Sequence, residues 1–160
     1  MVLSDEIKRC VNQVVGASGE TAAAVIMLGA NPNLTAGAVA QALAITPSGV
    51  ARLIDRLEAD GIVIRKSGSD QRVVVMELTQ EGHRLRSAAL EARAIVLRKC
   101  LVGISADEIK AIAPILDKMI QNLLPDRASC NRFCRMCDEE ACEPHCPVEE
   151  HHPLVSLMIE

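Results

Sequence analysis

The chain has 160 residues, of which 49% are hydrophobic and 24% are charged. This length fits one small domain with an appendage and argues against a two-domain enzyme with a broad substrate cleft, and the apolar fraction excludes a wholly disordered chain. Because the sequence has no Trp or Tyr and a single Phe, its core must be built from aliphatic side chains, which suits packed helices.

Charge is divided unevenly along the chain. Residues 128–160 contain seven acidic and two basic residues, a net charge of −5, whereas residues 1–127 carry +1. The acidic net charge of the whole chain is therefore compatible with a local basic face on the first 127 residues.

The beginning of the chain lacks the apolar central region of a secretory signal. The longest apolar run, residues 21–30, is about half of the ~20 residues that a membrane-spanning helix needs. We expect a cytoplasmic protein without a membrane partner, and a reducing compartment favours metal ligation or thiol chemistry over structural disulfides.

Three helices are predicted in the first part of the chain. The first covers residues 3–15 and ends near Gly16, and the second runs to Leu28 before the break at residues 31–33. Thr35 is a suitable N-cap for a third, short helix that ends at Leu43.

The clearest helix is predicted over residues 47–60. Thr46 is its N-cap, Pro47 occupies the first helical position, and Gly61 follows its end. Its apolar residues repeat at i, i+3, i+4 and i+7, which predicts one buried stripe made of Val50, Leu53, Ile54 and Leu57. The opposite face carries small side chains, polar side chains and arginines, which suits a helix that contacts an anion.

The pattern then changes to a hairpin followed by two helices. Residues 62–65 and 73–78 are β-branched runs separated by a polar tip, and Thr79 can cap a long helix over residues 80–100. Ser105 and Glu108 form a capping box for a last helix with an apolar stripe at Ile109, Ile112, Leu116, Met119 and Leu123. Pro114 lies inside this helix and is expected to kink it.

Residues 34–82 resemble the DNA-binding core of the multiple-antibiotic-resistance regulator (MarR) family. The specific parts are the helix, tight turn and helix ending in RLEADG, the D-x-R signature at Asp70 and Arg72, and the LT-x-x-G junction that begins at Leu78. The resemblance implies a mainly α fold with a small β-hairpin wing, in other words a winged helix-turn-helix core with dimerising terminal helices. It divides the chain into N-terminal helices (1–33), the DNA-binding core (34–82), dimerisation helices (83–127) and a Cys-rich acidic tail (128–160), which has no counterpart in the family.

Helical geometry and the resemblance together identify residues 47–60 as a recognition helix for the major groove. The predicted DNA-binding residues are Thr46, Ser48, Arg52, Arg56, Arg65, Lys66 and Arg72. Asp70 is expected to pair with Arg72 and orient it, because phosphate repels a carboxylate. The alternative for each arginine alone is an ordinary solvated side chain.

Five cysteines follow one another at ligand-like spacing in the tail, C-x3-C-x2-C-x4-C-x3-C, at Cys130, Cys134, Cys137, Cys142 and Cys146. Spacings of two to four residues let a short loop bring thiolates to one centre. An iron–sulfur cluster is favoured because a structural zinc needs only four ligands; zinc and a metal-free thiol switch remain the alternatives. Cys10 and Cys100, in predicted helices, are expected to be small buried residues without chemistry.

The sequence therefore predicts a homodimeric transcription regulator, most simply a repressor, that binds a pseudo-palindromic operator in double-stranded DNA. Its metal-binding tail would act as a redox or metal sensor. The first alternative is a repressor relieved by a small organic effector, with a structural zinc tail. The second is an iron–sulfur enzyme or electron carrier, which the sequence disfavours because it shows no nucleophile–base pair and no phosphate-binding loop.

Overall fold

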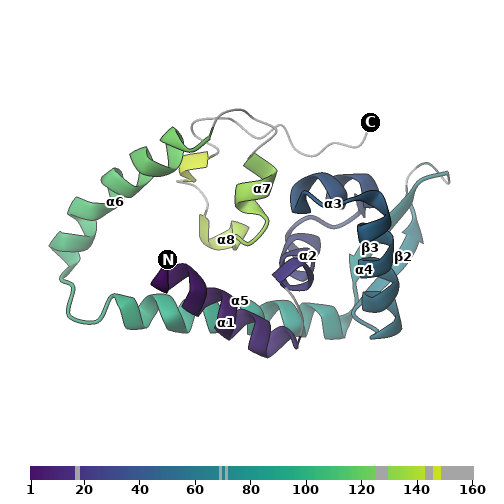
Figure 1. Ribbon diagram of the computed structural model, residues 1–160, viewed down its shortest axis with the longest axis horizontal. Helices are drawn as coiled ribbons and strands as arrows, with labels where there is room; N and C mark the ends of the chain where they lie inside the picture. The colour runs from purple at the N-terminus through teal and green to yellow at the C-terminus, as the bar shows by residue number, and fades with distance from the viewer. Residues whose placement is uncertain (17–18, 69, 71, 125–129, 143–145, 149–160) are drawn as a thin grey trace.

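The computed structural model describes residues 1–16, 19–68, 70, 72–124, 130–142 and 146–148, and it is mainly helical with one small sheet (Figure 1). In chain order the first elements are α1 (Val2–Val15), α2 (Gly19–Ala30), β1 (Leu34–Thr35), α3 (Ala36–Leu43) and α4 (Pro47–Ala59). They are followed by β2 (Val63–Ser67), β3 (Val74–Leu78), α5 (Gln80–Cys100), α6 (Ala106–Asn122) and the short helices α7 (Cys130–Cys134) and α8 (Glu139–Cys142). Across these described residues no single helix is long and apolar enough to cross a membrane, although two bent pairs, α1 with α2 and α3 with α4, reach that length and composition together.

Side-chain caps fix the starts of four helices at the predicted positions. The hydroxyls of Thr35, Thr46 and Thr79 accept the backbone N–H groups that open α3, α4 and α5. Ser105 and Glu108 form the complete capping box at the start of α6. Each cap satisfies N–H groups that have no partner within the helix, which explains why these starts could be placed from sequence. Helix α6 continues through Pro114 as one element.

The sheet has three antiparallel strands in the order β1-β3-β2. Strands β2 and β3 form the predicted hairpin, with Val63 opposite Leu78 and Ser67 opposite Val74. The third strand, β1, was not predicted, because two residues are too few to show an alternating pattern. Leu34 is placed by its pairing with Met76 and by its burial in the main core.

The main hydrophobic core joins this sheet to α2, α3 and α4. The predicted stripe of α4 is buried in it, with Val50 and Leu57 fully enclosed. Helix α2 is buried along most of its length and supplies Ala24, Val25 and Leu28 to the same core. The winged helix therefore depends on α2 as well as on residues 34–82.

Outside this core, α5 runs along one edge of the molecule, away from the winged helix, with α1 beside it, and α6 turns back from the far end of α5 (Figure 1). Val11 of α1, Ile26 of α2 and Leu90 of α5 form a second buried cluster. In contrast, α6 has no buried residue. Its apolar side chains are exposed at Ile109, Ile112, Ile115, Leu116, Met119 and Ile120.

Replacing Gly82 with Ala is expected to destabilise the protein by about 1–3 kcal/mol, the usual range for overpacking a core. A Cβ atom at this position would lie 2.3 Å from the backbone oxygen of Ile62 and 3.1 Å from the side chain of Leu78. The backbone of Ile62 cannot rotate out of the way as a side chain can, so the junction between β3 and α5 would have to move. Chemical denaturation followed by circular dichroism measures the change. Gly19→Ala is the control, because a Cβ there meets nothing within 4 Å; equal stability losses for both variants would contradict this account.

Candidate nucleic-acid interface

The exposed face of α4 begins with a small group of polar side chains. Thr46 accepts the N–H of Gly49 at 3.1 Å, and its hydroxyl lies 3.1 Å from the hydroxyl of Ser48. Arg52, one turn later, donates from Nε to the carbonyl of Ser48 at 3.4 Å and is exposed. Two hydroxyls and one guanidinium thus lie side by side on the first turn and a half of the helix.

The cations at the base of the wing are already paired with acids. Arg65 lies between Asp55, at 2.5 Å, and Glu58, both on α4. The hydrogen bond that Arg65 donates to Asp55 is the largest cause that raises the pKa of Arg65 above its usual value. Lys66 pairs in the same way with Glu77 of β3. These two predicted DNA-binding residues must exchange an existing partner before they can hold a phosphate.

Asp70 has a role different from the one predicted for it. Its carboxylate accepts the backbone N–H of Arg72 at 2.9 Å, so the contact shapes the turn at the tip of the wing instead of holding the guanidinium. The side chain of Arg72 is exposed. Within the described part of the chain, Arg52 and Arg72 form no ion pair with an acidic side chain.

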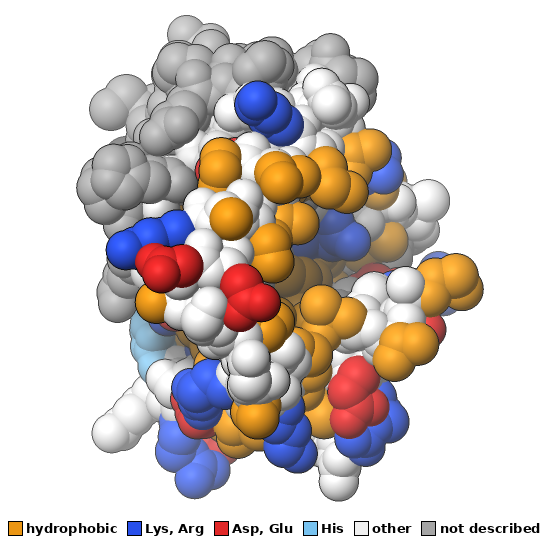
Figure 2. All heavy atoms as spheres, turned by 90° about the vertical axis from the view of Figure 1, so that its left-hand side faces the viewer, with side chains coloured by type: hydrophobic (Ala, Val, Ile, Leu, Met, Phe, Trp, Pro, Cys, Tyr) orange, Lys and Arg blue, Asp and Glu red, His pale blue; other side chains and the backbone are white. Residues whose placement is uncertain are grey.

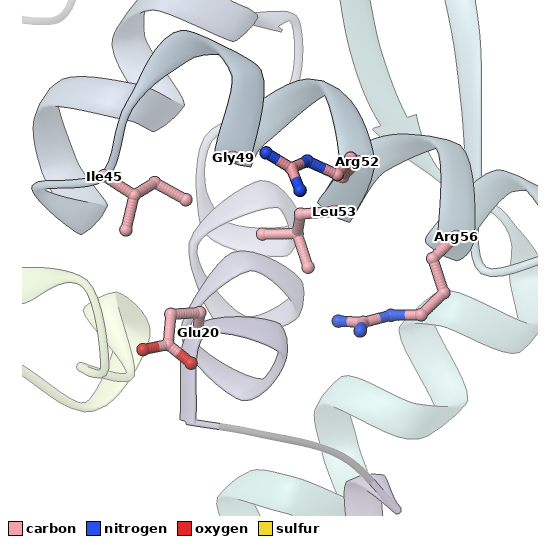
Figure 3. Close-up of a pocket in the computed structure, with 6 residues that line it drawn as sticks. All are labelled: Glu20, Ile45, Gly49, Arg52, Leu53 and Arg56. Atoms are coloured by element: carbon pink, nitrogen blue, oxygen red, sulfur yellow. The ribbon is translucent and has the colours of Figure 1, made fainter.

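Arg56 faces another way along α4. Its Nη2 atom donates to the hydroxyl of Thr21 at 2.6 Å, and Thr21 is buried at the start of α2. Figure 3 shows Arg56 and Arg52 at the rim of a cavity between α4 and α2. Its volume is about 280 Å³, and its lining residues are Glu20, Ile45, Gly49, Arg52, Leu53 and Arg56. Sequence reasoning missed Glu20, Thr21 and Ile45, because no local pattern shows which helix packs against α4.

Four cysteines of the tail come together in the structure. Cys146 is buried with Leu124 and Val148, and Cys134 and Cys142 pack against this cluster. The thiols of Cys146 and Cys137 neighbour that of Cys142. As the side chains are placed, no group of three among the described His, Cys, Asp and Glu residues could hold a metal ion. The side chain of Cys130, the fifth predicted ligand, lies outside the described part of the tail.

The environment of Cys142 opposes ionisation. Burial, followed by the neighbouring thiols of Cys146 and Cys137, raises its pKa to about 12. A cation that binds there must therefore displace protons from the thiols.

The two cysteines outside the tail differ from the prediction. Cys10 is half-buried, with its thiol 3.7 Å from the carboxylate of Glu6. Cys100 is exposed at the end of α5, so the expectation of a buried residue is wrong there. The last turn of α5 leads into α6, which has no buried residue and so does not cover it.

Comparisons with known proteins agree with this geometry. Residues 16–73 match the model of the MarR family. The fold resembles that of the YusO protein from Bacillus subtilis, with a TM-score of 0.65 and 23% identity over 75% of this chain and 85% of that chain. It also resembles Streptococcus pneumoniae FabT, whose structure is a complex with DNA, with a TM-score of 0.64 and 22% identity over 76% of this chain and 90% of that chain. For MarR from E. coli the TM-score is 0.60 and the identity 18%, over 74% of this chain and 91% of that chain.

Proposed function

We propose that the protein is a MarR-family transcription regulator that binds double-stranded DNA, because residues 16–73 match the model of that family. The helix that enters the major groove is α4, and the wing formed by β2 and β3 contacts the adjacent backbone. FabT, a protein of similar fold, has been crystallised with DNA, which supports the proposal.

The observation that carries the proposal is the exposed start of α4. Thr46 and Ser48 offer hydroxyls, and Arg52 offers a guanidinium that no described carboxylate neutralises. A cation on a helix that fits the groove can donate to phosphates and to base edges. Because Arg65 and Lys66 are neutralised by Asp55, Glu58 and Glu77, Arg52 and Arg72 are the stronger contributors.

Replacing Arg72 with Ala is expected to weaken binding to all duplex sequences about equally. A cation on the wing neutralises phosphate, so its loss lowers the slope of log affinity against log salt by about 1 per wing. Fluorescence anisotropy of labelled DNA over a range of salt concentrations measures both effects. Arg84→Ala is the control, since Arg84 is an exposed cation on α5 that pairs with Glu81 at 2.7 Å. An unchanged salt dependence for the Arg72 variant would show that the wing does not contact DNA.

The proposed regulator binds DNA as a homodimer on a pseudo-palindromic operator. The exposed apolar face of α6 supports this part of the proposal. Figure 2 shows hydrophobic side chains gathered around a hollow on the side of the molecule where α6 lies. Exposed apolar surface of this extent is typical of a protein interface.

The proposed signal is the state of a Cys-ligated centre in the tail, which makes the protein a redox or metal sensor. The thiols of Cys134, Cys142 and Cys146 gather in one apolar cluster, with Cys137 next to Cys142, and soft thiolates of this kind select zinc and iron–sulfur centres. Binding a centre requires the thiols to rearrange, because no three of them are placed to hold a metal ion. An iron–sulfur cluster remains our first choice and zinc the alternative. Colour tests this directly, because a chain without Trp or Tyr barely absorbs at 280 nm and a cluster adds a broad visible band; colourless protein with one zinc per chain would overturn the cluster.

The cavity beside α4 favours a second candidate signal, a small organic anion. Its lining has two guanidinium groups, the one carboxylate of Glu20 and the apolar side chains of Ile45 and Leu53, and the resulting net positive charge suits a ligand with one carboxylate and an apolar body. A ligand there would contact Arg52 and so compete with DNA. Release of DNA by a small carboxylate from the protein without a metal centre would support this candidate, and insensitivity of Arg56→Gln to the same compound would locate the ligand.

A further inference from the structure

The segment that carries α4 and the wing has no net charge. Residues 46–78 contain five basic and five acidic residues. Binding to DNA of any sequence depends mainly on charge, because each cation that neutralises a phosphate releases counterions from the duplex. A neutral segment gains little from such binding, so the way in which its charges are paired decides which cations can reach DNA.

Two exposed cations of this segment lie at its ends. Arg52 on the first half of α4 and Arg72 near the tip of the wing are exposed, and in the described part of the chain neither pairs with an acidic side chain. Between them, Arg65 and Lys66 of β2 both have acidic partners. The candidate interface therefore has an available cation at each end and a neutralised middle.

Two carboxylates of α4 hold Arg65. Asp55 and Glu58 are three positions apart, so they are neighbours on one face of the helix, and β2 packs beside α4 (Figure 1). Arg65 places one guanidinium nitrogen on each acid: Nη2 lies 2.5 Å from Oδ1 of Asp55, and Nη1 donates to Oε2 of Glu58. Two acids thus surround one base, and the group of three carries one negative charge more than it carries positive charge.

The group is open to solvent, so its pairs can be exchanged. The side chain of Arg65 is 35% exposed, that of Asp55 is 65% exposed and that of Glu58 is 41% exposed. Ion pairs in contact with water contribute little to stability, because water and salt screen them. A phosphate that is held against β2 can take the place of the carboxylates, whereas a phosphate more than about 10 Å away is screened.

On the premise of the proposed DNA-binding function, we infer that Asp55 and Glu58 are specificity-determining residues. By neutralising Arg65 they weaken binding to duplex of unrelated sequence more than they weaken binding to the operator. The partner that they discriminate against is therefore DNA without the operator sequence.

The discrimination follows from how closely β2 approaches the duplex. When α4 is seated in the major groove of its operator, the wing lies against the backbone, and a phosphate replaces the acids around Arg65. On unrelated DNA α4 finds no matching base edges and is not seated, so Arg65 keeps its acidic partners. The surplus negative charge of the group then repels the phosphates, which is a penalty that only the wrong partner meets in full.

The double substitution Asp55→Asn and Glu58→Gln tests the inference on the full chain. It is expected to raise the affinity for a labelled duplex of unrelated sequence about 10-fold at 0.1 M salt. The slope of log affinity against log salt should steepen by about 1 for each chain, because Arg65 becomes available to a phosphate. Fluorescence anisotropy over a series of salt concentrations measures both effects.

The operator is expected to respond less. On the duplex upstream of the protein's own gene the same variant should gain no more than about 3-fold, since the contact of Arg65 with phosphate already exists there. The ratio of the two affinities therefore falls. Weaker binding to both duplexes would show that the ion pairs position the wing instead, and it would overturn the inference.

Glu6→Gln with Glu91→Gln is the matched control. It removes two carboxylates and releases two arginines far from α4, because Glu6 pairs with Arg9 at 2.7 Å and Glu91 pairs with Arg98 at 2.5 Å. The control should keep the salt slope of the wild type on unrelated DNA. An equal gain in the control and in the test variant would mean that net charge alone is responsible.

A triple variant separates the release of Arg65 from the loss of repulsion. Adding Arg65→Ala to the substitutions of Asp55 and Glu58 is expected to restore the wild-type salt slope on unrelated DNA. A slope that stays steep without Arg65 would overturn the inference. All three side chains are on the surface, so circular dichroism should show the wild-type fold.

The inference and the proposed function can fail separately. Wild-type protein that binds no duplex even at low salt would refute the proposed function and the inference with it. If the wild type binds its upstream duplex but the double variant keeps the wild-type affinity for unrelated DNA, the inference alone is refuted.

Discussion

The double substitution Leu116→Glu and Met119→Glu is expected to convert the dimer into a monomer and to weaken operator binding by about 10²- to 10⁴-fold. Both side chains are about half exposed on α6, at 49% and 56%. Carboxylates on this face would be buried without partners in a dimer, which costs far more than exposing them in a monomer. A monomer contacts one half-site only, so it loses the gain that comes from linking two sites.

Light scattering with refractive-index detection measures the mass, since absorption at 280 nm is weak in this chain. Lys118→Glu is the matched control. It changes the net charge by the same amount as the double substitution, but Lys118 is not part of the apolar stripe. A double variant that remains a dimer would show that α6 does not form the interface.

Arg52→Ala is expected to lower operator affinity by about 1–3 kcal/mol for each half-site and to relax the preference for one base. The guanidinium lies on the exposed face of α4 with the hydroxyls of Thr46 and Ser48. Its alanine variant keeps the buried stripe of the helix, so the fold should be unaffected. The loss should exceed that of Lys66→Ala, because Lys66 already has a partner in Glu77.

Competition binding with operator variants measures the two effects of Arg52→Ala. Arg98→Ala is the control, because Arg98 is an exposed cation on α5 that pairs with Glu91 at 2.5 Å. Equal affinities for the Arg52 and Arg98 variants would exclude α4 as the recognition helix.

Local chemistry explains why most of the fold could be predicted from sequence. Three features depend only on residues close together in the sequence: the N-caps, the proline at the first position of α4 and the apolar stripe of that helix. The structure confirms all three. Strand β1 escaped prediction because it is defined by its pairing with Met76, which is 42 positions later in the chain. The same reason hid the hydrogen bond that holds Arg56 to Thr21, 35 positions away.

The same distinction between local patterns and contacts of distant segments applies to the candidate site. The sequence identified the cations near α4 and the wing, but it could not show that Arg65 is neutralised by Asp55 and Glu58. It also identified the cysteine cluster, because the ligand spacing is local. It gave no sign that Asp138 docks this cluster on Arg86, since an ion pair between the tail and α5 depends on how two distant segments pack.

Footprinting on the DNA upstream of the protein's own gene tests the central claim most directly. The account predicts a protected region with two half-sites about one helical turn apart, lost as salt rises and absent for Arg52→Ala. Wild-type protein that protects no segment of that DNA, both with and without a centre in its tail, would contradict it.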